Sequence, residues 1–244
     1  HVTIEHCGDT NQGCIWLDSG VHLAMNNTSV RHAAGIALEL EEEAGLIGFS
    51  DNTLTDNGSH PISLGANSCG DLQSGTYTPN GAEGILVRDE TITKNATWAA
   101  LDTPYYLEYG LFAETDNGTA HITISGGAEL QLGDGAAIVI GKWAALNLDG
   151  SPGNRVRLTS GKSSPAAGDW QFIEIAANAS DCSFSHTDIR YGGGSSQQTI
   201  QLKAGAQLTI ASTIISDSEH ACDIQVPTGA TLVDNGGNTF TSCD

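Results

Sequence analysis

Basic residues are scarce in this chain, which has 9 Lys and Arg against 29 Asp and Glu and a formal net charge of −20. A balance of this sign repels the phosphates of nucleic acids and the anionic surfaces of membranes. We therefore expect no nucleic-acid partner and no membrane insertion. A solvated acidic surface is the simplest explanation of the charge.

Long apolar runs are also missing. No stretch approaches the roughly 20 apolar residues of a transmembrane helix, and no charged-then-apolar signal segment opens the chain. We expect that any secretory signal has been removed. Aromatic residues are few at 6%, and one Met and 6 Pro stand against 30 Gly. This composition favours a turn-rich β protein over a helical bundle.

The six cysteines lack the spacing of a zinc site. Their even number is typical of an oxidising compartment, so we expect a secreted or cell-surface protein. Cys7 and Cys14 are close in sequence, and Cys222 and Cys243 are about one repeat apart, so both pairs are disulfide candidates.

A short phrase returns along the chain. Residues 52–58 (NTLTDNG) come back as residues 75–81 (GTYTPNG), and the same frame occurs earlier at residues 27–33 (NTSVRHA). Part of it returns at residues 238–241. Each of the first three copies is followed by a short apolar segment, and periods of this length are typical of solenoids.

Strict alternation around pairs such as Ile122 and Ile124 predicts short strands, with Gly and Asp-Gly turns between them. Residues 33–45 have helical propensity. The register of the repeat places Ile36, Ile62 and Ile85 in one frame. It therefore predicts that Ile36 and Leu38 are strand residues, with Glu41–Glu43 in an exposed loop. Residues 91–115 have no clean frame, and we expect an irregular crossing segment that still supplies strands.

A longer repeat links the two ends of the chain. Residues 1–58 match residues 186–244 with an offset between 185 and 188, which indicates an internal duplication within one domain spanning residues 1–244. No polar terminal cap is evident. We therefore expect either a segment of a longer protein or ends that another copy or irregular structure covers.

These patterns predict an all-β solenoid, a right-handed parallel β-helix of roughly 10–11 coils with ~23-residue repeats stacked about 4.8 Å apart. Aligned asparagines, Asn27 with Asn52 and Asn57 with Asn80, are expected at turns as hydrogen-bonded ladders.

The repeated phrases and the segment Gly168-Asp169-Trp170, followed by Ile189-Arg-Tyr-Gly-Gly-Gly, resemble secreted bacterial right-handed β-helix repeat proteins of the pectate-lyase-like superfamily. The resemblance covers nearly the whole chain. It implies a fold rather than a function, because that superfamily contains lyases, hydrolases, adhesins and proteins without known activity.

Lyases of this superfamily use Lys or Arg as the base beside acidic Ca²⁺ ligands, and its hydrolases have clustered Asp motifs. No such motif occurs here, so enzymatic activity is uncertain, and we assign no catalytic residue. We expect no metal site and no cofactor. Acidic turns such as Asp116-Asn117-Gly118 could hold Ca²⁺, although Asx turns explain them equally well.

Threonines form a row in the repeated phrase. Outward pairs are expected at Thr53/Thr55, Thr76/Thr78 and Thr239/Thr241, with Thr28 and Thr213 extending the row. Such a row resembles the ice-binding face of solenoids, although threonine is also simply a good strand residue.

We expect a non-catalytic extracellular structural or adhesive module that associates end to end with itself. The first alternative is a module that binds or cleaves an extracellular polysaccharide, and the second is an ice-binding solenoid. Exposed aromatic residues would be the sugar platforms, and the candidates are Trp16, Trp98, Tyr105, Tyr106 and Trp170.

Overall fold

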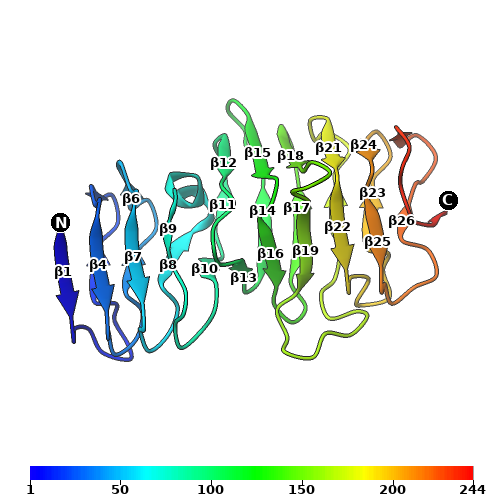
Figure 1. The fold of residues 1–244 in the computed structure, drawn as a ribbon. Helices are drawn as coiled ribbons and strands as arrows, with labels where there is room; N and C mark the ends of the chain where they lie inside the picture. The colour runs from blue at the N-terminus through cyan, green and yellow to red at the C-terminus, as the bar shows by residue number, and fades with distance from the viewer. Residues whose placement is uncertain (244) are drawn as a thin grey trace.

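The chain folds into a parallel β-solenoid of about nine turns. The structure is a computed structural model and describes residues 1–243. Short strands pair in parallel from one coil to the next, and the single helix of the described residues is the 3-10 helix η1 (Ala66–Asp71). Figure 1 shows the coils side by side along an elongated molecule, with β1 at one end and β26 near the other. The fold predicted from the repeat is therefore confirmed.

The longest sheet has nine strands, one for each turn of the solenoid. Its strands are β2 (Ile15–Leu17), β5 (Leu38–Leu40), β8 (Ile62–Gly65), β10 (Ile85–Arg88), β13 (Tyr105–Leu107), β16 (Glu129–Leu132), β19 (Val156–Ser160), β22 (Thr187–Arg190) and β25 (Ile214–Ser216).

Four shorter sheets form the other sides of the coils. The four-stranded sheet contains β1 (Val2–Glu5), β4 (Thr28–Arg31), β7 (Asn52–Thr55) and β9 (Gly75–Thr76), and β3 (His22–Leu23) pairs with β6 (Gly45–Leu46). The seven-stranded sheet contains β11 (Thr91–Ile92), β14 (Gly110–Ala113), β17 (Ala137–Ile140), β20 (Ile173–Ile175), β23 (Ile200–Leu202), β26 (Ile224–Gln225) and β28 (Ser242–Cys243). The six-stranded sheet contains β12 (Ala96–Trp98), β15 (Ala120–Ser125), β18 (Ala144–Asp149), β21 (Cys182–Ser185), β24 (Gln207–Ala211) and β27 (Thr231–Asp234).

The turns are longer and fewer than the repeated phrase predicted. Successive strands of the nine-stranded sheet, from Ile15 to Ile215, follow one another with ~25-residue spacing. The shortest step joins Ile85 to Tyr105 and the longest joins Val156 to Thr187. The last turns lengthen because loops such as residues 161–169 leave the coil between strands.

The core is a stack of inward side chains, one layer from each coil. The residues that follow one another along the nine-stranded sheet are apolar and largely buried, and they are Leu38, Ile62, Ile85, Tyr105, Leu130, Leu158, Ile189 and Ile215. Each coil covers the apolar face of the one before it. Burial of each Leu or Ile side chain stabilises the folded protein by about 1.5–3 kcal/mol. No coil could be stable alone.

Two ambiguous stretches of the sequence are settled. Residues 33–45 contain a strand rather than a helix, followed by a turn at Glu41–Glu43, as predicted. The strand β5 contains Leu38 but not Ile36, which precedes it. Residues 91–115 supply strands as expected. β13 continues the nine-stranded sheet, whereas β11 and β12 begin the seven-stranded and six-stranded sheets after the four-stranded sheet has ended at β9.

Asparagine side chains hold the corners between coils. The predicted ladder exists at Asn57, whose Nδ2 donates to Asn80 Oδ1 at 2.9 Å. The predicted pairing of Asn27 with Asn52 was wrong. The buried Asn52 instead accepts from the Thr28 backbone N–H at 3.0 Å and donates to the Met25 carbonyl at 2.8 Å. It thereby satisfies two backbone groups of the preceding coil.

The two ends matched in sequence share this corner. Asn238 accepts from the Thr213 N–H and donates to the Ile210 carbonyl, as Asn52 does with Thr28 and Met25. The matched strands nevertheless occupy different sheets, because β1 lies in the four-stranded sheet and β22 in the nine-stranded sheet. The two matched segments are therefore rotated relative to each other around the solenoid, so that corresponding strands lie in different sheets. Asp244, the last residue of the matched range, lies outside the described residues.

Disulfides fasten the first and last coils. Both predicted bonds are confirmed, with Cα–Cα distances of 4.9 Å for Cys7–Cys14 and 6.1 Å for Cys222–Cys243. Cys69 and Cys182 are buried thiols. The two disulfides are compatible with an extracellular protein.

We expect that replacing Cys222 and Cys243 with serine loosens the last coil without unfolding the rest. A terminal coil contacts only one neighbour, and a disulfide closing a 21-residue loop contributes about 3 kcal/mol. Hydrogen exchange should accelerate in β26 and β28 while β15 and β18 stay protected. The matched control replaces Cys7 and Cys14, which should affect β1 and β2 instead. Exchange that accelerates equally along the whole solenoid would contradict local fastening.

Candidate functional site

Three of the five aromatic residues predicted as sugar platforms lie in the core. Trp98, Tyr105 and Trp170 are 0% exposed, so the prediction was wrong for them. The rings of Trp98 and Tyr105 lie 5.0 Å apart, and the Tyr105 hydroxyl donates to the Ala99 carbonyl. Large aromatics fill the shortest coil of the solenoid, where fewer residues are available to fill the interior.

The other two predicted aromatics, Trp16 and Tyr106, reach the outward face of the nine-stranded sheet. Trp16 is 43% exposed, and Tyr106 is partly exposed and stacks on His60 with ring centroids 6.0 Å apart. Burial raises the pKa of Tyr106, and Glu108 raises it further, so its hydroxyl stays neutral. Exposed Tyr109 and Trp143 were not predicted, because exposure at a corner depends on coil geometry rather than on alternation.

The predicted threonine row does not form one continuous surface. Thr53 lies in register with Thr76 and with Ser29 on the four-stranded sheet, but Thr55 lies opposite Arg31. The partners predicted to extend the row, Thr28 and Thr213, are buried. Thr78 donates to Glu83. At the far end of the molecule, Thr239 forms a parallel β-bridge with Ile214. The Thr241 hydroxyl lies within hydrogen-bond distance of the Ala221 carbonyl and the Asp223 carboxylate.

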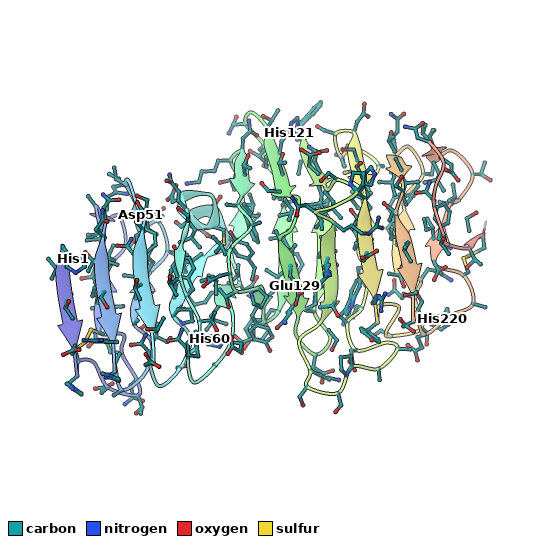
Figure 2. The ribbon with its side chains drawn as sticks, in the orientation of Figure 1. His1, Asp51, His60, His121, Glu129 and His220 are labelled. Atoms are coloured by element: carbon teal, nitrogen blue, oxygen red, sulfur yellow. A yellow bond between two sulfur atoms is a disulfide. The ribbon has the colours of Figure 1, made fainter. Side chains whose placement is uncertain are left out.

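Arginine is concentrated at the nine-stranded sheet, which the sequence did not indicate. Of the five arginines, Arg88, Arg157 and Arg190 lie on its strands and Arg155 directly precedes β19. Two of them line a cleft of about 390 Å³ on the outward face of β16, β19 and β22, whose other polar lining residues are Glu129, Thr159, Asp188 and Tyr191. Figure 2 labels Glu129 in the lower half of the view, below His121 at the upper edge.

The two arginines of the cleft are only weakly neutralised by the protein. The Arg157 side chain is 66% exposed and lies 3.9 Å from a Glu129 oxygen. Asp188 is engaged elsewhere, because Arg155 Nε donates to it at 2.9 Å. Within residues 1–243, no hydrogen bond or ion pair engages the exposed Arg190 guanidinium. In a chain of charge −20, the cleft therefore has positive charge available for a ligand.

Buried Trp170 positions the rim of this cleft. Its indole Nε1 donates to the Arg190 carbonyl at 2.7 Å. Its ring lies so close to Gly192 that a Cβ there would be 2.7 Å from a ring carbon. Trp170 therefore holds the turn that presents Arg190 and Tyr191, and it acts from the core rather than by contacting a sugar.

The loop at residues 161–168 forms a second rim and contributes Pro165 to the cleft. Asp169 anchors it by accepting hydrogen bonds from Ser160 Oγ at 2.6 Å and from Lys162 Nζ at 2.9 Å. Burial opposes ionisation of Asp169, but these bonds and the Ala166 N–H outweigh it and lower the pKa of the carboxyl group. Asp169 therefore remains a carboxylate, and the loop is fixed, at neutral pH.

A second cleft of about 570 Å³ lies at the other end of the same sheet and is acidic. Trp16 lines it, and its indole N–H donates to Glu41 at 3.1 Å. Arg88 also lines it but lies 3.7 Å from both Glu39 and Glu41, so its charge is offset. An anionic ligand would be repelled here and attracted to the Arg157–Arg190 cleft.

The two thiols outside the disulfides, Cys69 and Cys182, are not available as thiolate nucleophiles at neutral pH. Burial raises the pKa of the Cys182 thiol to about 11 and that of Cys69 well above its usual value, so both stay protonated. Over residues 1–243 no group of three or more His, Cys, Asp and Glu side chains has the arrangement of a metal site. No helix within that range is long and apolar enough to cross a membrane.

Comparisons of the chain with protein-family models, with curated proteins and with solved structures gave no match, so its function is inferred from the geometry described above.

Proposed function

We propose that the protein is a non-catalytic extracellular module that holds an acidic polysaccharide on the outward face of the nine-stranded sheet. Its main binding groups are Arg157 and Arg190, with Tyr191 and Thr159 beside them. The observation that carries this proposal is the pair of exposed, weakly neutralised guanidinium groups in one cleft of a strongly acidic protein.

Guanidinium groups suit carboxylate and sulfate groups, because their planar N–H fork can donate two parallel hydrogen bonds. Arg157 and Arg190 come from adjacent strands, β19 and β22, and so stand one coil apart along the solenoid. Arg157 lies opposite Asp188, so Arg190 is displaced from Arg157 by one strand and by two residues along it, a diagonal of about 8 Å. A polymer that crosses the strands obliquely could present acidic groups to both arginines. Electrostatic repulsion at the acidic cleft would confine the ligand to the C-terminal half of the face.

Secretion and membership of the pectate-lyase-like group are parts of this proposal. The disulfides at both ends and the resemblance of the Gly168–Trp170 segment support them. Retention at a polysaccharide-coated surface would make the module adhesive.

Replacing Arg157 and Arg190 with glutamine is expected to abolish binding of the acidic polymer. Each charged hydrogen bond lost should weaken binding about tenfold or more. Isothermal titration with alginate or polygalacturonate measures this, with neutral dextran for comparison. Arg31→Gln is the matched control, because Arg31 is a half-exposed arginine on the four-stranded sheet. Wild-type protein that binds no acidic polymer, or a double variant that binds as wild type does, would refute the proposal.

A second candidate function is end-to-end association of copies, which the open edges of the terminal coils favour. Among residues 1–243, β1 pairs with β4 alone and β27 with β24 alone. Val2 and Val21 at one end and Val233 at the other are exposed. An unpaired strand edge with apolar side chains is a template for another strand. Light scattering should then show a mass that grows with concentration, whereas a monomer at every concentration would exclude association.

A further inference from the structure

Asparagine followed directly by glycine occurs four times in the chain, at Asn57, Asn80, Asn117 and Asn235. In such a pair the backbone nitrogen of the glycine can attack the side-chain carbonyl carbon of the asparagine, because no Cβ on the glycine obstructs the approach. The nitrogen and the amide carbon must be free to move toward each other. Hydrogen bonds that hold either group therefore protect an Asn-Gly pair, and these bonds differ among the four pairs.

Both reacting groups of the Asn57-Gly58 pair are fixed by hydrogen bonds. Asn57 is 3% exposed, and its side-chain oxygen accepts from the Ala33 N–H at 3.1 Å. Its Nδ2 donates to the Val30 carbonyl at 3.3 Å and to Asn80 Oδ1 at 2.9 Å. The Gly58 N–H, which carries the attacking nitrogen, donates to the Ala33 carbonyl at 2.9 Å. Neither group can approach the other unless the corner between these coils opens.

The Asn80-Gly81 pair is held in the same way. Asn80 Nδ2 donates to the Leu54 carbonyl at 2.9 Å and to the Tyr77 carbonyl at 2.6 Å. The Gly81 N–H donates to the Asn57 carbonyl at 2.7 Å. The side-chain amide and the attacking nitrogen are therefore both tied to the backbone, and the reaction would have to break these bonds first.

Asn235 is exposed, but the backbone on both sides of its side chain is anchored. Its own N–H donates to the Ile210 carbonyl at 2.9 Å, and the Gly236 N–H donates to Asp234 Oδ1 at 2.7 Å. The Gly236 carbonyl accepts from the Ser212 N–H at 2.9 Å. The Asn235-Gly236 pair therefore lies in a turn that is bound to the coil before it.

The Asn117-Gly118 pair has much more freedom. It lies in the exposed loop that joins β14 to β15. Within residues 1–243, neither the Asn117 side chain nor the Gly118 N–H takes part in a hydrogen bond. A Cβ built on Gly118 would meet no atom within 4 Å beyond its chain neighbours, so the space around the pair is open. The Thr115 hydroxyl restrains only the Asn117 backbone, because it donates to the carbonyl at 3.0 Å and accepts from the N–H at 3.2 Å.

We propose that Asn117 is a deamidation site and that the fold confines this modification to it. The Gly118 nitrogen bonds to Asn117 Cγ and loses its proton, while the Cγ–Nδ2 bond breaks and the amide group leaves as ammonia. Water then opens the resulting succinimide ring at either carbonyl, which yields aspartate or isoaspartate. Either product adds a negative charge beside Asp116, which pairs with Lys142 at 3.0 Å. The site shares no residue with the cleft on the nine-stranded sheet, so it does not depend on the proposed polysaccharide function.

Peptide mapping by mass spectrometry, after incubation of the folded protein at mildly alkaline pH, tests the proposal. Alkaline pH speeds the reaction because the attacking nitrogen must lose its proton. The peptide with Asn117 should convert at least about tenfold faster than the peptides with Asn57, Asn80 and Asn235, since two or more hydrogen bonds restrain each of those pairs. The same protein in urea is the control, because all four pairs should then convert at similar rates.

A pair of substitutions tests the position independently. Asn117→Gln should remove the acidic species that ion-exchange chromatography separates from the starting protein, because the longer glutamine side chain would have to close a larger ring. Asn235→Gln is the matched control, since it replaces another exposed asparagine of an Asn-Gly pair, and it should leave the acidic species unchanged. Circular dichroism verifies that both variants are folded.

Three results would overturn the proposal. The first is a folded protein in which Asn117 stays intact. The second is another Asn-Gly pair that converts as fast as Asn117 in the folded protein. The third is an Asn117→Gln variant that accumulates the acidic species at the wild-type rate.

Discussion

Replacing Trp98 with alanine is expected to lower the free energy of unfolding by about 3–5 kcal/mol. Trp98 is 0% exposed, and its ring lies against Tyr105 in the shortest coil. Alanine would leave a cavity that the stacked coils on either side could not close without breaking their register. Urea unfolding followed by circular dichroism measures the change, and hydrogen exchange of β12 and β15 shows where the solenoid opens.

Phenylalanine at the same position retains part of the buried ring volume and removes the indole N–H. The Trp98 Nε1 is buried and has no hydrogen-bond partner in the described residues, so Trp98→Phe removes a group that contributes no bond. We expect Trp98→Phe to cost less than Trp98→Ala, because the phenyl ring leaves a smaller cavity than the methyl group does. Trp16→Ala, on the half-exposed tryptophan of the same solenoid, should cost less than Trp98→Ala. A larger loss from Trp16→Ala would contradict the assignment of Trp98 to the core.

The fold was predictable from the sequence because successive coils of a solenoid repeat a similar pattern of residues at a regular interval. The repeated phrase set the strands of residues 27–87 and identified Glu41–Glu43 as a turn. The register itself was misjudged, since Ile36 was aligned with Ile62 and Ile85, whereas Leu38 lies opposite Ile62. A slip of two residues keeps the same side chains inward, so the alternation alone could not reveal it.

The repeat could not be followed through residues 91–115 for a different reason. The core here is filled by Trp98, Tyr105 and Leu107 in place of the Ile and Leu pairs of other coils. The repeated sequence pattern is therefore not recognisable in this segment, although the segment still forms strands. Aromatic side chains in a short coil replace the volume that missing residues would supply. Their identity as core residues became visible only with the neighbouring coils in place.

The candidate site was less predictable than the fold, since it is assembled across coils. Arg157 and Arg190 are distant in sequence and meet because β19 and β22 are adjacent strands. The disulfide of Cys222 with Cys243 was predictable since its spacing is close to one coil, so the period alone placed the two residues together.

Replacement of Asn52 is the second substitution that we expect to lower the stability of the protein strongly. Its side chain is 0% exposed and satisfies the Thr28 N–H and the Met25 carbonyl of the preceding coil. We expect Asn52→Ala to lower the free energy of unfolding by about 2–4 kcal/mol, because each buried backbone group left without a partner costs about 1–3 kcal/mol. Asn52→Leu should not restore stability, since it replaces volume but neither hydrogen bond. Urea unfolding compares the three proteins.

The matched asparagine near the other end of the solenoid is the control. Asn238 makes equivalent bonds to the Thr213 N–H and the Ile210 carbonyl, but it is partly exposed. Water can replace its side chain there, so Asn238→Ala should cost only about 1 kcal/mol. Equal losses at both positions would show that the bonds themselves, rather than their burial, determine the cost. A smaller loss at Asn52 would contradict the view that buried corner asparagines hold successive coils in register.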